Sequence, residues 1–138
     1  MSWIVAGLIG GVVAWLADWV LWSKVFTKGM EELAVKMSPE EMKAFMGPAM
    51  AKSAILAIAY GLIFTYLYAQ FRTDLWVNGG GPLAGMEFAT VLWLPTIALM
   101  TMGSGVWYTK ARALLQANFW AWLIRMNLVG LVVGILLK

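Results

Sequence analysis

Four long apolar stretches take up most of this chain of 138 residues. They cover residues 3–22, 53–71, 82–102 and 113–137. A helix needs about 20 apolar residues to cross the hydrocarbon core of a bilayer, and each stretch has roughly that length. The sequence therefore predicts an all-α polytopic membrane protein, with one four-helix transmembrane domain over residues 1–138.

Composition supports this class of protein and excludes several kinds of cofactor and catalytic site. Hydrophobic residues make up 62% of the chain and charged residues 12%, whereas soluble domains carry about 25% charged residues. There is no cysteine and no histidine, which removes the usual ligands of iron–sulfur clusters and haem. The serines have no histidine to act as a base. We therefore expect no enzyme and no resident cofactor, although a bound lipid, quinone or carotenoid remains open.

Basic residues predict the orientation of the helices, because lysine and arginine concentrate in cytoplasmic loops. Seven of them lie on one side of the predicted membrane and two on the other, the seven being Lys24, Lys28, Lys36, Lys43, Lys52, Lys110 and Arg112, and the two Arg72 and Lys138. The bias places both termini outside or in the periplasm. The net charge of +3 is then a topology signal, and we expect no nucleic acid partner.

The connection between the first two stretches contains a short predicted helix. Ser38, Pro39 and Glu41 form a capping-box pattern, with proline at the first helical position. The pattern predicts a short amphipathic cytoplasmic helix from Pro39 to about Met46, ended by Gly47-Pro48. Such a helix would rest on the membrane surface or on a partner, or would only connect the two membrane helices.

Small residues at four-residue spacing predict where helices pack closely, since lipid tails are as apolar as leucine and close backbone approach must hold the bundle together. These helix-packing candidates are Gly7, Gly11 and Ala14 in the first stretch, Ala57 and Gly61 in the second, and Gly130 and Gly134 in the fourth.

Three charged residues lie inside the apolar stretches, namely Asp18, Glu87 and Arg125. Charge is costly in hydrocarbon, so these residues are the leading functional candidates. Their depths along the helices favour an ion pair between Glu87 and Arg125, with Asp18 left to cytoplasmic water, Lys24 or Lys110. Such a network would lock the register of the bundle or carry protons.

Several deep aromatic residues form a second candidate set, together with one amide: Trp15, Trp93, Asn118, Trp120 and Trp122. They would contact a partner helix or lipid, line a site for a flat apolar ligand, or pack within the core. The fourth stretch also carries two specialised faces, which suggests an oligomer or a larger complex. One face holds Asn118, Ala121, Trp122 and Arg125, and the other holds Asn127, Gly130 and Gly134. Pro95 predicts a kink in the third helix.

Several short segments together resemble a known family: DWVLWSKVF at 18–26, Gly-Met at 29–30, Met-Ala-Lys at 50–52, and LLQAN at 114–118 followed by Gly130 and Gly134. They are similar to the bacterial DUF1761 family of small four-helix membrane proteins. The resemblance implies a four-helix architecture in the bacterial inner membrane. It implies no activity, because none is established for the family.

Two functional hypotheses follow. The first is a non-enzymatic accessory or structural subunit that packs against other membrane helices in an oligomer or larger complex. The alternative is a small transporter or proton-conducting oligomer that uses Asp18 and Glu87, the two titratable residues within the membrane helices.

Overall fold

The computed structural model describes residues 1–28, 38–77 and 80–137, and within them the chain is helical with no β-strand. Four helical regions are long and apolar enough to cross a membrane: Trp3–Val25, Pro39–Asp74, Pro82–Trp107 and Thr109–Leu136. The predicted all-α fold is confirmed. The residues at 29–30 that contributed to the family resemblance, and Lys36 and Lys138 from the orientation pattern, lie outside the described residues.

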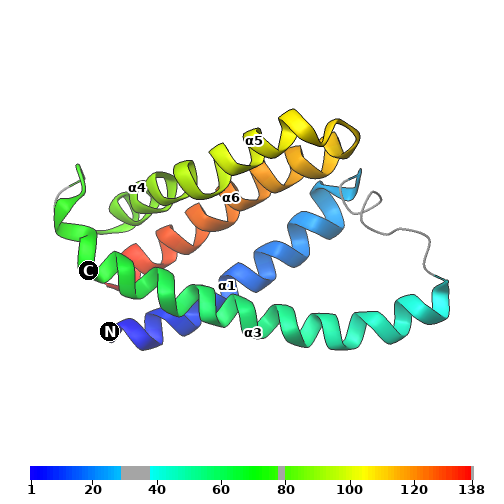
Figure 1. Ribbon diagram of the computed structural model, residues 1–138. Coiled ribbons are helices and arrows are strands. Elements are labelled where there is room, and N and C mark those ends of the chain that lie inside the picture. The colour runs from blue at the N-terminus through cyan, green and yellow to red at the C-terminus, as the bar shows by residue number, and fades with distance from the viewer. Residues whose placement is uncertain (29–37, 78–79, 138) are drawn as a thin grey trace.

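Figure 1 shows the order of the elements. In chain order they are α1 (Trp3–Val20), the π-helical turn η1 (Leu21–Val25), α3 (Pro39–Phe71), the 3₁₀ turn η2 (Arg72–Asp74), α4 (Pro82–Trp93), the π-helical turn η3 (Leu94–Ala98), α5 (Leu99–Trp107), the 3₁₀ turn η4 (Thr109–Ala111) and α6 (Arg112–Leu136).

The capping box at the start of α3 is present as predicted. The Ser38 hydroxyl accepts a hydrogen bond from the Glu41 amide at 3.2 Å, and the Glu41 carboxylate accepts one from the Ser38 amide at 3.2 Å. The predicted end at Gly47-Pro48 is wrong, because α3 continues through Pro48 without interruption. Alanine, methionine and lysine around Pro48 favour helix, and nothing packs within 4 Å of a Cβ at Gly47 to force a turn.

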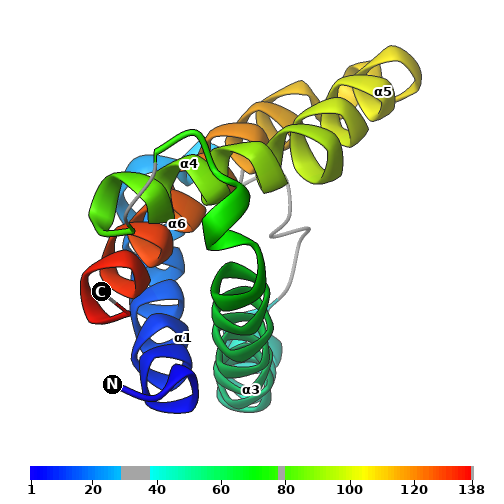
Figure 2. The same cartoon turned by 90° about the vertical axis from the view of Figure 1, so that its left-hand side faces the viewer.

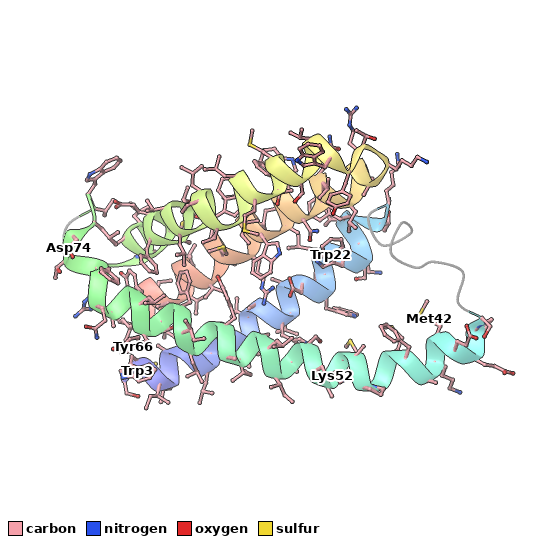
Figure 3. The ribbon with its side chains drawn as sticks, in the orientation of Figure 1. Trp3, Trp22, Met42, Lys52, Tyr66 and Asp74 are labelled. Atoms are coloured by element: carbon pink, nitrogen blue, oxygen red, sulfur yellow. The ribbon has the colours of Figure 1, made fainter. Side chains whose placement is uncertain are left out.

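The uninterrupted α3 is longer than a bilayer core. Its 33 residues extend about 50 Å, against about 30 Å for hydrocarbon. Residues 39–52 form an exposed extension beyond the bundle, in which Met42 and Lys52 are labelled in Figure 3. The apolar part that follows, residues 53–71, matches the predicted second membrane stretch.

The helices associate as two pairs, α1 with α3 and α4 with α6, and the pairs meet where α1 packs on α6 (Figure 2). Glycine makes the first pair close, because a Cβ on Gly61 would lie under 3.0 Å from the backbone of Gly7 and Gly11. Ala14 and Ala57 are fully buried in the same region. The predicted packing faces of α1 and α3 therefore lie at their mutual contact.

A second glycine contact joins α4 to α6. A Cβ on Gly85 would meet the backbone of Gly130 at well under 3.0 Å, and one on Gly134 would meet Gly81. Gly130 and Gly134 thus pack as predicted, whereas Gly85 was missed. Its signal was present in the sequence, since Gly81, Gly85 and Ala89 repeat at four-residue spacing.

Aromatic rings fill the remaining side of the bundle, where α3 faces α4 and α6. The Phe88 ring packs edge-on against Phe64 at 5.2 Å and Tyr68 at 5.7 Å between centroids. Tyr60 meets Trp122 in the same way at 5.9 Å. Edge-to-face pairs of this kind add stabilisation beyond the apolar area that they bury. Large rings therefore fill the wider space on this side, whereas glycines allow close backbone contact between α1 and α3 and between α4 and α6.

Pro95 lies in the π-helical turn η3, which separates α4 from α5. Proline has no N–H to donate, and a π-turn accommodates the lost hydrogen bond within a continuing helix. The Thr96 hydroxyl donates to the Leu92 carbonyl at 2.6 Å. Beyond this turn α5 contains no buried residue and projects away from α1 and α3, as Figure 2 shows.

The glycine contact between α1 and α3 yields the first prediction. Gly61→Ala should lower the free energy of unfolding in mixed detergent micelles by about 1 to 3 kcal/mol, because the added methyl must push two backbones apart. Gly47→Ala is the matched control in the same helix, where the methyl meets open space and alanine favours helix. Equal effects of the two substitutions would contradict the close packing.

Candidate functional site

An ion pair in the middle of the bundle is the main polar feature of the structure. Asp18 of α1 and Arg125 of α6 form it, with 2.8 Å between a carboxylate oxygen and a guanidinium nitrogen. The Arg125 side chain is 9% exposed, and the Asp18 side chain is 31% exposed. The cation is therefore enclosed by protein, whereas part of the anion still faces the surroundings.

Two aromatic rings enclose the cation further. The Arg125 guanidinium carbon lies 4.4 Å from the centre of the Trp122 ring and 4.9 Å from that of Tyr60. The negative face of an aromatic ring attracts a cation, and a desolvated contact of this kind is worth about 2 kcal/mol. Arg125 thus joins three helices, because Asp18 belongs to α1, Tyr60 to α3 and Trp122 to α6 itself.

Two buried polar atoms around the Arg125 guanidinium have no hydrogen bond. The Arg125 Nε and the Tyr60 hydroxyl are both buried and have no partner. The Thr65 and Tyr68 hydroxyls on α3 are in the same condition. Tyr60 was not among the predicted site residues. A signal existed, because Tyr60 neighbours Gly61 and shares the face of α3 that carries Ala57 and Phe64.

The predicted pair of Glu87 with Arg125 is wrong. Both Glu87 carboxylate oxygens accept backbone hydrogen bonds from the segment before α4, from the Trp76 amide at 2.7 Å and the Val77 amide at 2.8 Å. The prediction compared only how deep the charged residues lie along their helices. It did not consider which face of α6 carries Arg125. Val129 and Val133 continue that face at four-residue spacing, and both pack beside Gly10 of α1.

The three charged residues therefore perform two separate tasks. Asp18 and Arg125 join α1 to α6 within the bundle. Glu87 fixes the chain at one end by satisfying two amides that have left the helix. The expected contacts of Asp18 with Lys24 or Lys110 do not form, and its ion-pair partner is Arg125.

The deep aromatic candidates fall into two groups. The Trp15 indole donates to the Ser53 hydroxyl at 3.1 Å, the Trp93 indole donates to the Phe119 carbonyl at 3.2 Å, and Trp122 faces Arg125. These three tryptophans have internal partners. Trp120 is 51% exposed and remains available to a partner or to lipid. Asn118 is half-buried.

Both specialised faces of α6 are used inside the bundle. Gly130 and Gly134 pack on α4, where Asn127 also lies 3.2 Å from the Thr90 hydroxyl. On the other face Ala121 and Arg125 are buried. The second face therefore needs no partner chain to cover it, which removes that argument for an oligomer.

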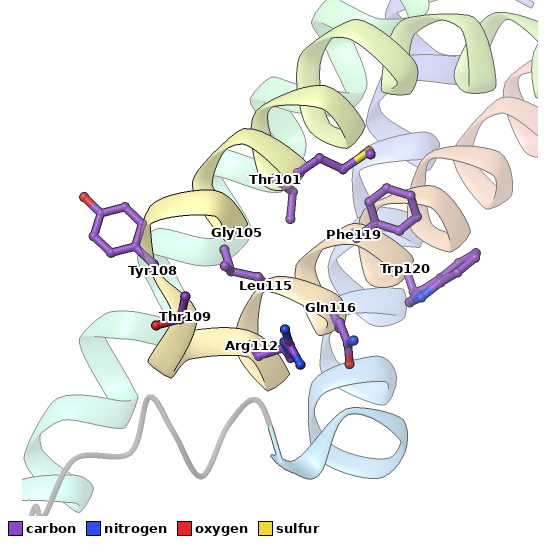
Figure 4. A pocket seen from close by; sticks show the side chains of 10 residues that line it. Thr101, Gly105, Tyr108, Thr109, Arg112, Leu115, Gln116, Phe119 and Trp120 are labelled. Atoms are coloured by element: carbon purple, nitrogen blue, oxygen red, sulfur yellow. The ribbon is translucent and has the colours of Figure 1, made fainter.

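Two open pockets lie between the α4–α5 region and a neighbouring helix. One of about 220 Å³ lies between α3, the η3 region and α6, has a wholly apolar lining, and is bounded by Tyr60, Phe64 and Trp122. The other, of about 170 Å³, lies between α5 and α6 (Figure 4). Among residues 1–28, 38–77 and 80–137, no three acidic side chains gather as metal ligands.

Comparison with known proteins adds no assignment: no family model, no curated protein and no solved structure matches this chain.

The ion pair yields the second prediction. Asp18→Ala should lower the free energy of unfolding by about 3 kcal/mol, because it leaves a buried guanidinium without its counter-ion. Adding Arg125→Met should restore most of that loss, since a buried pair replaced by apolar groups is close to neutral. Asp74→Ala is the control, because it removes an exposed acid that forms no ion pair with a described residue. Additive effects of Asp18→Ala and Arg125→Met in a double-mutant cycle would show that the two groups do not interact.

Proposed function

We propose that this protein is a non-enzymatic integral membrane subunit that packs against other membrane helices in an oligomer or larger complex. The observation that carries the proposal is the contrast between its polar and apolar groups. Arg125 and Glu87 are engaged within the chain, whereas every residue of the helical segment α5 is exposed or only partly buried. The free surface of the molecule is suited to association in a membrane.

The partner surface that we propose is centred on α5. Its large side chains are among the most exposed in the protein, with Met100 68%, Val106 70% and Trp107 83% exposed. Trp120 of α6, which lies beside α5, adds an exposed aromatic ring to this surface. Tryptophan is enriched at the centres of interfaces and contributes strongly to binding there.

The extension of α3 offers a second contact outside the hydrocarbon. Phe45 and Met46 are 53% and 45% exposed on a helix that also carries Glu40, Glu41 and Lys43. A rigid amphipathic helix attached to a membrane helix fits either the membrane surface or a polar part of a partner. This role replaces that of the separate short helix predicted from the sequence.

The transport alternative rests on one observation, the 31% exposure of the Asp18 side chain. A proton path needs titratable groups in sequence across the membrane. Here Glu87 is held by two backbone amides in the segment before α4, and Asp18 is paired with a residue that does not titrate. A stable double variant, Asp18→Ala with Arg125→Met, that abolished proton flux in proteoliposomes would favour transport.

We also propose that the protein inserts in the bacterial inner membrane, as the resemblance to the DUF1761 family implies, with both termini outside.

The chain has no native cysteine, so single cysteines report orientation without background. Thr73→Cys, in η2, should react with an impermeant maleimide in intact cells, and Thr109→Cys, in η4, only after lysis. Both positions are exposed. The reverse pattern would contradict the proposed orientation, and protein lost to carbonate washing would contradict insertion.

The subunit role is tested by extraction from native membranes in mild detergent, followed by native-gel separation and mass spectrometry. We expect the chain to migrate with stoichiometric partners, or as a homo-oligomer. Replacing Val106 and Trp107 with alanine should release it, whereas replacing Ile55 and Leu56, 68% and 70% exposed on α3, should not. A monomer in every detergent would contradict the proposal.

A further inference from the structure

We propose that the pocket between α5 and α6 binds an anionic phospholipid. The inference rests on the membrane insertion proposed above and is independent of the protein partner. Figure 4 shows the pocket, an open groove of about 170 Å³ at the turn that joins the two helices.

The pocket is divided between apolar and polar side chains. Met102, Leu115 and Phe119 provide apolar walls, and Thr109, Arg112 and Gln116 provide polar groups. Arg112 is the first residue of α6, at the end of the membrane span, and Met102 lies further along α5 toward its middle. A phospholipid has this same division, with a phosphate at the interface and acyl chains directed into the hydrocarbon.

The volume suits part of an acyl chain. An apolar cavity of about 150 Å³ binds benzene, so 170 Å³ accommodates several methylene groups. A whole membrane helix, about 10 Å wide, is too large to enter. A free phosphate ion would contact the polar rim and leave the apolar walls uncovered.

The basic residues near the pocket favour a lipid with an anionic headgroup. Lys110 and Arg112 are exposed beside the pocket, and neither forms an ion pair with a described acid. A second pocket of about 310 Å³ lies on the other side of the start of α6 and includes Lys28. The two pockets share Gln116 and Trp120, and none of the acidic residues that the structure describes lines either of them.

The basic character extends across this end of the bundle. The α5–α6 turn and the end of η1 lie at the same end in Figure 1, and η1 contains Lys24. Basic pockets between membrane helices on the cytoplasmic side attract anionic headgroups, which agrees with the orientation inferred from the lysine and arginine distribution. Trp120 lines both pockets about 12 Å further along α6 than Arg112, where its exposed ring suits contact with an acyl chain.

The test is a native mass spectrometry titration of the full chain in mild detergent, with phosphatidylglycerol and phosphatidylcholine of identical acyl chains. Phosphatidylglycerol should bind more tightly. Arg112→Gln should weaken phosphatidylglycerol binding about fivefold, the effect of one basic residue near the surface, and leave phosphatidylcholine unchanged. Lys43→Gln removes the same charge from the α3 extension and should change neither.

Two glycine substitutions test the pocket itself. A Cβ on Gly105 would lie 3.9 Å from Leu115, an ordinary contact, so Gly105→Leu should fill the pocket without disturbing the fold. It should weaken binding of both lipids. Gly103→Leu is the matched control, because a Cβ there meets nothing within 4 Å and Gly103 does not line the pocket. Thermal unfolding curves confirm that each variant is folded.

Equal affinity for the two lipids would overturn the proposal. So would equal effects of Arg112→Gln and Lys43→Gln, or of Gly105→Leu and Gly103→Leu. None of these results depends on co-migration with a partner, and insertion is measured separately by carbonate extraction, so the failure of one proposal is distinguishable from the failure of the other.

Discussion

Arg125 is a buried cation in a bundle of apolar helices, and the positions of α1, α3 and α6 make its burial tolerable. An isolated charge in such surroundings would cost several kcal/mol. Asp18 neutralises it from α1, while Tyr60 and Trp122 place ring faces over the guanidinium. Since these groups come from three helices, the ion pair specifies one register of the bundle among the many that apolar contacts alone would permit.

The two glycine contacts allow those helices to approach. Helix association in lipid gains little from burying apolar surface, so van der Waals contact between backbones must supply much of the attraction. Gly61 brings α3 onto α1, and Gly85 with Gly130 brings α4 onto α6. Aromatic rings occupy the wider side, where Phe88 packs between Phe64 and Tyr68. After η3, α6 is the long helix against which α5 packs among the described residues, and the outer side of α5 stays exposed. Both the subunit proposal and the lipid proposal depend on this exposed segment.

Much of this fold was predictable from the sequence, because the relevant signals are local. Apolar length located the four helical regions that could span a membrane, and Ser38 and Glu41 located the start of α3. Small residues located the contact of α1 with α3 and the α6 side of the contact with α4. Two predictions failed for different reasons. Gly47-Pro48 predicts a helix end, yet α3 continues through it, because helix formers lie on both sides and nothing packs against Gly47 to force a turn. The partner of Arg125 depends on which helix faces it in three dimensions, and depth along a helix carries no such information.

The most direct test of this account is the partner of Arg125 in a bilayer. Solid-state NMR of protein in liposomes, with ¹⁵N in the arginine side chains and ¹³C in the aspartate carboxyl groups, measures the contact through space. Within the described residues Asp18 with Arg125 is the one ion pair, so we predict a nitrogen–carboxyl contact that disappears in Asp18→Asn. Labelling glutamate in place of aspartate should give no contact to Arg125, because no described glutamate pairs with it. A contact to a glutamate carboxyl instead, or none to aspartate, would contradict the structure at its centre.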